Sequence, residues 1–126
     1  MEHLHFGGIR LGILSQHPRV ALTELVVQPG LVAPAHRHAA ADEVFYGLSP
    51  GLEVQVDGAW HGLAPHAVVA APAGSSHGFR NTGQVPARAL VVFTPGRFVD
   101  FFREAHSVAE TTQLKAVMAR WGVSSG

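Results

Sequence analysis

The sequence predicts an all-β domain of about eight or more short strands, arranged as a sandwich or a barrel. Three observations lead to this fold class. Short runs rich in valine and leucine recur along the chain, each bounded by glycine or proline. One run, residues 52–56, alternates apolar and polar side chains and is followed by Asp57-Gly58, a strong signal for a two-residue hairpin turn. The length of 126 residues, with 47% hydrophobic and 14% charged residues, suits a single domain around one core.

Eight segments have the composition and length of strands. They are residues 9–14, 20–27, 32–36, 43–48, 52–56, 68–71, 76–80 and 87–93. Their near-regular spacing is typical of sandwiches and barrels.

The pattern becomes helical after residues 94–96. Thr94 and Pro95 are placed as the N-cap and the first residue of a helix. From Phe98 onward the apolar residues fall on helical spacing. We therefore expect residues 1–94 to form the β-structure and residues 95–122 to form a C-terminal helical extension of the same single domain.

A second helix is predicted within this extension. Ser107-Val108-Ala109-Glu110 matches a capping box, and Gly122 is placed to end the helix. Its apolar stripe consists of Leu114, Val117, Met118 and Trp121. We interpret this stripe as core packing rather than as a cofactor site.

Composition and charge exclude several classes of function. Nine lysine and arginine residues balance nine aspartate and glutamate residues, so the charge does not favour binding to nucleic acid or to an anionic membrane. The absence of cysteine excludes disulfides, thiol nucleophiles, thiolate zinc sites and iron–sulfur clusters. The first residues lack the pattern of a targeting segment, and the apolar stretch 67–73 is far too short to cross a bilayer. We expect a soluble, cytoplasmic protein.

Histidine is the residue type that points to chemistry, because the chain has nine of them. Chance alone accounts for roughly 0.6 His-x-His pairs in such a chain, so a single pair proves little. His3 and His5 form one pair with no accompanying acid or glycine pattern, and we interpret it as a solvated surface feature. His17, His61 and His106 lack partners at ligand spacing and are also expected at the surface.

The second pair, His36 and His38, lies at a predicted strand, where residues two apart project from the same face. Glu43 follows after a turn, on the neighbouring strand, and His77 enters a later strand after a turn shaped by proline and glycine. Taken singly, each histidine could be an ordinary half-buried residue. Together, three imidazoles and one carboxylate suit one divalent transition-metal ion, namely Fe, Mn, Ni, Co, Cu or Zn. Four protein ligands leave coordination positions open for a substrate, water or dioxygen.

These residues resemble the two motifs of the cupin superfamily. The first motif is matched by Gly30, His36, His38 and Glu43, and the second by Pro72, Gly74, His77 and Asn81. The fit is specific, since Asn81 is the only asparagine in the chain. Less specifically, the stretch 94–98 is similar to that of small quercetin dioxygenase-like cupins.

Two positions depart from the motifs. The glycine that closes the first motif is Gly51, one residue late, so we expect the turn before it to be remodelled. The glycine that opens the second motif is replaced by His66, which we expect to be a surface turn residue. Neither change affects a ligand position.

The resemblance implies an antiparallel jelly-roll barrel with His36, His38, Glu43 and His77 holding a metal ion inside one end and the C-terminal helices packed outside. Phe45 and Phe79 lie two residues from Glu43 and His77, so alternation along the strand directs them to the same interior. They are candidates for the wall of a substrate pocket, with ordinary core packing as an equal alternative.

The function implied by the resemblance is that of a metal-dependent dioxygenase acting on a small organic molecule, such as a phenol. Glu43 would be the catalytic residue and would accept the proton of a substrate hydroxyl group. Fold alone does not establish this activity. A non-catalytic cupin that binds a metal or a small ligand, and a cupin isomerase, remain alternatives. We also expect a homodimer, because a partner commonly covers the exposed strand edges of a small barrel.

Overall fold

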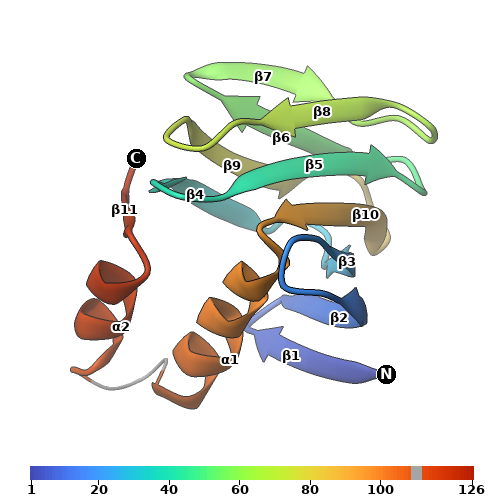
Figure 1. Cartoon of the computed structure of the whole chain (residues 1–126). Coiled ribbons are helices and arrows are strands. Elements are labelled where there is room, and N and C mark those ends of the chain that lie inside the picture. Colours follow the sequence, from blue (N-terminus) through green and yellow to red (C-terminus); the bar gives the residue numbers. More distant parts are fainter. Residues whose placement is uncertain (109–111) are drawn as a thin grey trace.

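The computed structural model describes residues 1–108 and 112–126, which form two β-sheets with two helices at one end (Figure 1). The six-stranded sheet has the order β1-β2-β3-β10-β5-β8, and the five-stranded sheet has the order β11-β4-β9-β6-β7. The strands are β1 (Glu2–Phe6), β2 (Ile9–Gln16), β3 (Ala21–Val27), β4 (Val32–His38), β5 (Asp42–Gly47), β6 (Leu52–Val56), β7 (Ala59–Gly62), β8 (Val68–Ala71), β9 (Ser76–Asn81), β10 (Ala87–Thr94) and β11 (Val123–Ser125).

This arrangement confirms the predicted fold class. The strands pair in antiparallel fashion, and the core lies between the sheets, as in a jelly roll. The two sheets are not closed into one continuous barrel. All eight predicted strands are present, with ends that differ from the prediction by at most two residues.

The structure also contains three strands that were not predicted, namely β1, β7 and β11. Each lies at an edge of a sheet. Edge strands are short and solvated, so they lack the continuous apolar pattern of central strands. In β1, Leu4 is the one buried side chain, while His3 and His5 are exposed, as expected for a surface pair.

The predicted hairpin at Asp57-Gly58 is confirmed. It joins β6 to β7, and Val56 pairs directly with Ala59 across the turn. Asp57 has a φ of 48° and Gly58 a φ of 86°. Two consecutive residues with positive φ are what a type I′ turn requires, and this turn type matches the twist of the flanking strands.

Asn81 ties the two sheets together. Its side chain is 2% exposed, and its Nδ2 donates to the carbonyl oxygen of Val27 in the opposite sheet and to that of Val85, both at 2.9 Å. The backbone N–H of Gly83 donates to Asn81 Oδ1 at 2.8 Å. The asparagine of the second motif therefore has a structural role in this chain.

We predict that Asn81→Ala lowers the free energy of unfolding by about 2 kcal/mol, because buried backbone groups lose their hydrogen-bond partner. Urea denaturation measures this change. Thr82→Ala, at the next and exposed position, is the matched control and should leave stability within about 0.5 kcal/mol of the wild type. Equal stability of the two variants would contradict the role assigned to Asn81.

The start of the first helix differs from the prediction. A 3₁₀ turn, Gly96–Phe98, precedes α1 (Val99–Val108). Pro95, rather than Thr94, occupies the N-cap position, where its backbone is extended and no side chain caps the turn. The Thr94 hydroxyl donates instead to Asp42 Oδ2 at 3.2 Å. Thr94 still belongs to β10, so strand pairing prevailed over the local helix-start signal. A Cβ on Gly96 would clash with the His17 carbonyl oxygen, so this close approach needs glycine.

The second helix begins later than predicted. Ser107 belongs to α1, where its hydroxyl donates to the Glu104 carbonyl oxygen at 2.8 Å, so Ser107 is not an N-cap. The rest of the predicted capping box includes Ala109 and Glu110, which lie outside the described residues. Helix α2 spans Leu114–Arg120, and Gly122, with a φ of 70°, follows its C-cap as predicted.

The two helices are joined through Glu104. Its Oε2 accepts hydrogen bonds from Arg120 Nη2 at 2.8 Å and from Trp121 Nε1 at 2.7 Å. The helices lie beside one end of the two sheets (Figure 1) and turn apolar side chains toward the interior. None of the helices in the described part of the chain has the length and apolarity needed to cross a lipid bilayer.

Candidate metal centre and cavity

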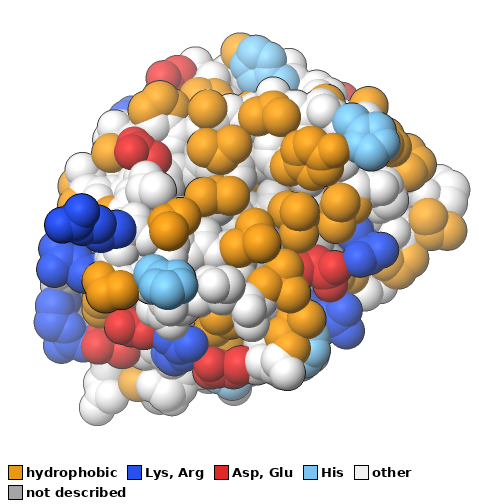
Figure 2. Space-filling model, turned by 45° about the vertical axis from the view of Figure 1, so that its right-hand side comes forward, with side chains coloured by type: hydrophobic (Ala, Val, Ile, Leu, Met, Phe, Trp, Pro, Cys, Tyr) orange, Lys and Arg blue, Asp and Glu red, His pale blue; other side chains and the backbone are white. Residues whose placement is uncertain are grey.

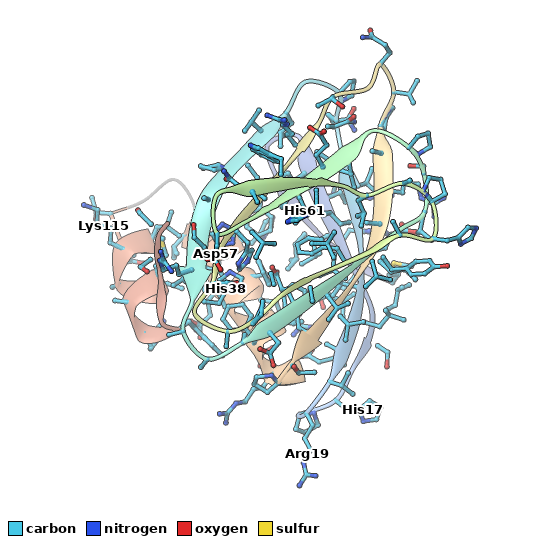
Figure 3. The ribbon with its side chains drawn as sticks, turned by 90° about the horizontal axis from the view of Figure 1, so that it is seen from above. His17, Arg19, His38, Asp57, His61 and Lys115 are labelled. Atoms are coloured by element: carbon cyan, nitrogen blue, oxygen red, sulfur yellow. The ribbon has the colours of Figure 1, made fainter. Side chains whose placement is uncertain are left out.

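Three histidines from two neighbouring strands converge inside the molecule. His36 and His38 lie on β4, and His77 lies on β9 directly opposite His36 in the register. The ring centroids are 4.6 to 4.8 Å apart, and each residue offers a nitrogen within 4.8 Å of the others. Figure 3 shows His38 within the molecule, whereas His17 projects from its surface. The spacing places the three imidazoles close enough to bind one ion.

Backbone carbonyl groups orient two of these rings. His36 Nδ1 lies 3.1 Å from the carbonyl oxygen of Pro34, and His77 Nδ1 lies 3.3 Å from that of Ser75. A carbonyl oxygen can only accept, so each Nδ1 carries the proton of the neutral ring. Nε2 is then left with a free lone pair. Metal-binding histidines are commonly oriented by this kind of hydrogen bond.

Three buried ring nitrogens in the cluster lack a hydrogen-bond partner among the described residues, namely Nδ1 and Nε2 of His38 and Nε2 of His77. An unpaired buried polar atom costs about 1–3 kcal/mol. The His77 nitrogen lies 2.7 Å from Glu43 Oε2, but without the alignment of a hydrogen bond. A cation bound by both His77 Nε2 and Glu43 Oε2 would give each of these atoms a partner, so the residues present fit a metal ion.

Glu43 comes from β5 of the six-stranded sheet and is 6% exposed. The strand places the Glu43 carboxylate against His77. The group of side chains whose ligand atoms all lie within 4.8 Å of one another consists of the three histidines and does not include Glu43. The four residues named from the sequence therefore meet in one region. Three form the cluster, and the fourth contacts one of them.

Protonation states in this region follow from burial and charge. Burial lowers the pKa of His36, and it lowers the pKa of His38 to about 4. Burial acts on His77 in the same direction, but the adjacent Glu43 carboxylate outweighs it and raises the His77 pKa. Burial would raise the pKa of Glu43, yet the contact with His77 and the nearby imidazoles outweigh it and lower that pKa. The directions for His36, His38 and Glu43 favour neutral imidazoles and an ionised carboxylate, the forms that bind metals, whereas the raised pKa of His77 means that its ring must give up a proton when an ion binds.

The cluster opens into a cavity of about 290 Å³ between the sheets. His36, His38 and Glu43 supply its polar groups. Phe45 and Phe79 both line it, with ring centroids 6.3 Å apart. The rest of the described lining is apolar, and these described residues include no lysine or arginine.

The helices contribute to this cavity, which the sequence interpretation missed. Side chains from α1 and α2 line it, namely Phe101, Phe102, Ala105, Leu114 and Met118. The helices therefore do more than pack outside the sheets. They close one side of the space next to His38, whose ring centroid lies 6.5 Å from those of Phe101 and Phe102. The apolar stripe of the second helix was the sequence feature that could have indicated this wall. The same residue pattern, however, occurs in helices that face a solid core and in helices that face a cavity.

The remaining histidines lie away from the cluster. His66 is an exposed turn residue with a φ of 70°, as expected for a position where glycine is common, and its Nδ1 lies 2.6 Å from the Tyr46 hydroxyl. His17, His61 and His106 are exposed. Gly51, the displaced glycine of the first motif, has a φ of 113° and packs against Asn81.

Comparison with known proteins agrees with the fold described above. A family model described as a cupin domain matches residues 23–93, a range that contains the three histidines and Glu43. The crystal structure of TT1209 from Thermus thermophilus is 31% identical over 75% of this chain and 90% of its own, with a TM-score of 0.67. KdgF from Halomonas sp. is 22% identical over 75% of this chain and 86% of its own, with a TM-score of 0.70. Comparison with curated proteins found no match.

A third solved structure is a sugar phosphate isomerase of the cupin superfamily from Silicibacter pomeroyi. It is 28% identical over 69% of this chain and 59% of its own, with a TM-score of 0.60.

Proposed function

The chain belongs to the cupin family, and we propose that it is a metal-dependent dioxygenase that acts on a small, largely apolar organic molecule, such as a phenol. One observation carries the proposal: the histidine cluster and Glu43 open directly into a cavity whose other walls are apolar and aromatic. An ordinary ligand site combines such walls with a few convergent polar groups.

His36, His38 and His77 would hold the ion, with Glu43 beside them. A divalent transition metal supplies redox chemistry and a coordination position for a substrate oxygen when it is bound. The chain itself orients the ligands, since Pro34 and Ser75 hold the Nδ1 atoms of His36 and His77. The apolar walls disfavour water in this space.

The size and lining of the cavity suggest the substrate class. A dry cavity of about 150 Å³ can hold benzene. The cavity here, at about 290 Å³, has room for a substituted ring or a fused pair of rings. The lining lacks the basic side chains that a phosphate group requires, at least among the residues described, so a sugar phosphate fits it poorly. Phe45 and Phe79 are proposed to flank the ring.

Glu43 is proposed to accept the proton of the substrate hydroxyl group at a carboxylate oxygen. The side chain lines the cavity, and its lowered pKa keeps it ionised at neutral pH. Accepting a proton in this position would convert a phenol into the phenolate, which is the more readily oxidised form. The His77 contact keeps the carboxylate at the edge of the cluster.

The direct test combines metal analysis with oxygen uptake. Protein loaded separately with Fe, Mn, Ni, Co or Cu is offered a panel of catechols and flavonols, and dissolved oxygen is followed with an electrode. The expected result is consumption of one dioxygen per substrate, with both oxygen atoms found in the product by mass spectrometry. Saturable binding of these compounds to metal-loaded protein with no oxygen uptake would refute the oxygenase and favour a binding protein.

We predict that Ala105→Leu weakens binding of a catechol by about tenfold while leaving metal content unchanged, because the larger side chain fills part of the cavity. Isothermal titration calorimetry on metal-loaded protein measures the affinity. Ala116→Leu, at an exposed position of α2, is the matched control and should bind as the wild type does. If both variants bind normally, the ligand does not occupy this cavity.

A further inference from the structure

A second space lies outside the cavity, between the 3₁₀ turn that follows β10, the turn between β4 and β5, and the C-terminal end of α2. We call it the basic groove, and its volume is about 510 Å³. It is lined by Ala40, Pro95, Arg97, Phe98, Ala119, Arg120, Trp121 and Gly122. None of these residues lines the cavity, so the two spaces are separate. Small-molecule sites commonly measure about 300–1,000 Å³, so the groove has room for one.

Two arginines give the basic groove its charge, and only one of them is neutralised. Arg120 Nη2 lies 2.8 Å from Glu104 Oε2. The Arg97 side chain is exposed, and its guanidinium has no ion pair or hydrogen bond within the described part of the chain. The described lining contains no carboxylate. The groove therefore keeps one positive charge without a counterpart, and a concave surface concentrates the field of such a charge.

Arg97 differs in this respect from the other arginines. Figure 2 shows one face of the molecule, where charged side chains of both signs lie toward the borders. Four arginines outside the groove pair with a carboxylate at 3.9 Å or less, namely Arg10, Arg80, Arg88 and Arg103. Arg37 donates to the Gly74 carbonyl oxygen at 2.8 Å. Arg19 projects into solvent from the turn between β2 and β3 (Figure 3). Arg97 alone among them combines a free guanidinium with a concave setting in the described chain.

An aromatic wall lies beside this charge. The indole of Trp121 is half-buried, and its Nε1 donates to Glu104 Oε2 at 2.7 Å, which fixes the orientation of the ring. The rings of Trp121 and Phe98 meet edge to face, with centroids 6.1 Å apart. A planar ligand ring packs favourably against an indole. A carboxylate on that ring can accept two parallel hydrogen bonds from a guanidinium.

We propose that the basic groove binds a small aromatic monocarboxylate, whose carboxylate pairs with Arg97 and Arg120 and whose ring lies against Trp121. The single uncompensated positive charge matches one carboxylate. A phosphate ester brings a charge of about −1.5 to −2 at neutral pH and would leave part of it unpaired. The site is independent of the metal centre and of the proposed dioxygenase activity, because it shares no lining residue with the cavity.

Isothermal titration calorimetry of the full chain with naphthalene-2-carboxylate tests the proposal. The expected result is one ligand bound per chain with a Kd between about 10 µM and about 1 mM, the range for a ligand of this size on an open site. Naphthalene-2-carboxamide has the same shape without the charge. It should bind at least about tenfold more weakly.

Three variants locate the binding site. Arg97→Gln should raise the Kd for naphthalene-2-carboxylate at least about tenfold. Arg19→Gln is the matched control and should stay within about twofold of the wild type. It removes the same charge from the neighbouring turn, where the Pro18 carbonyl oxygen accepts from the Arg97 backbone N–H, but it does not line the groove. Ala105→Leu, which fills part of the cavity, should bind as the wild type does.

Other outcomes overturn the proposal. A wild-type protein that shows no binding up to about 10 mM ligand has no such site. Equal weakening by Arg97→Gln and Arg19→Gln would reduce the effect to general attraction by surface charge. Binding that Arg97→Gln leaves intact, or that Ala105→Leu abolishes, takes place elsewhere than in the groove. Tighter binding of phenyl phosphate than of naphthalene-2-carboxylate would refute the assignment to a monocarboxylate.

Discussion

Replacing His36 and His77 together by alanine is expected to reduce the metal content of the purified protein from about one ion per chain to less than about a tenth. The double variant leaves His38 as the only imidazole of the cluster. It also removes the contact between His77 Nε2 and Glu43 Oε2. The His38 imidazole and the Glu43 carboxylate, which has lost its contact with His77, are too few ligands for a high-affinity metal site. Inductively coupled plasma mass spectrometry on protein without an affinity tag measures the metal content, since tag histidines would bind metal themselves.

The same variant should lose stabilisation by metal. A ligand that binds only the folded state raises the melting temperature by mass action, so added Fe, Mn, Ni or Co should raise that of the wild type and not that of the variant. His3→Ala with His5→Ala is the matched control, because it removes a His-x-His pair from the surface strand β1. The control should retain its metal. A folded His36→Ala/His77→Ala protein that still holds one ion per chain would rule out this metal centre.

The main features of the fold follow from local patterns. Period-two alternation and the glycine and proline residues between runs predict eight strands, seven of them inside a sheet and one, β8, at an edge, because a strand that buries one face shows this pattern. The edge strands β1, β7 and β11 depend instead on tertiary pairing. β11, for example, is only Val123–Ser125 and is held by pairing with the strand that carries His36 and His38. Such a segment has too few residues to show a period.

The helix starts show a second limit of local signals. Thr94 and Pro95 have the residue types of a helix start, yet the side chain of Thr94 bonds Asp42, far away in sequence. A long-range hydrogen bond of this kind is invisible to capping rules. Prediction at helix ends fails where a side chain has two possible partners and the tertiary one is used.

The histidine cluster was predictable from the sequence because strand alternation and motif spacing both fix which residues share one face of the sheet. The spacing does not predict the groups that surround the histidines. The contacts of His36 with Pro34 and of His77 with Ser75 depend on exact backbone geometry. The cavity walls from α1 and α2 depend on how the helices dock against the sheets. These walls set the size and polarity of the cavity, so the class of molecule that fits it cannot be predicted from the sequence motifs alone.

Glu43→Gln is expected to lower turnover at saturating metal and substrate by about 100-fold or more, the range that general-base catalysis contributes. Glutamine keeps the size of the side chain and one acceptor oxygen but cannot take up the substrate proton. The three histidines remain, so metal content measured on the same sample should fall far less than turnover does. Oxygen uptake with the best compound of the catechol and flavonol panel gives the rate, and metal analysis of the assayed sample normalises it.

The control for this variant is Glu53→Gln. Glu53 pairs with Arg80 at 2.6 Å outside the cavity, so its replacement removes a carboxylate without touching the metal centre and should leave turnover unchanged. Turnover of Glu43→Gln within about threefold of the wild type would exclude Glu43 as the proton acceptor. Loss of the metal in step with loss of turnover would instead assign Glu43 to ion binding alone.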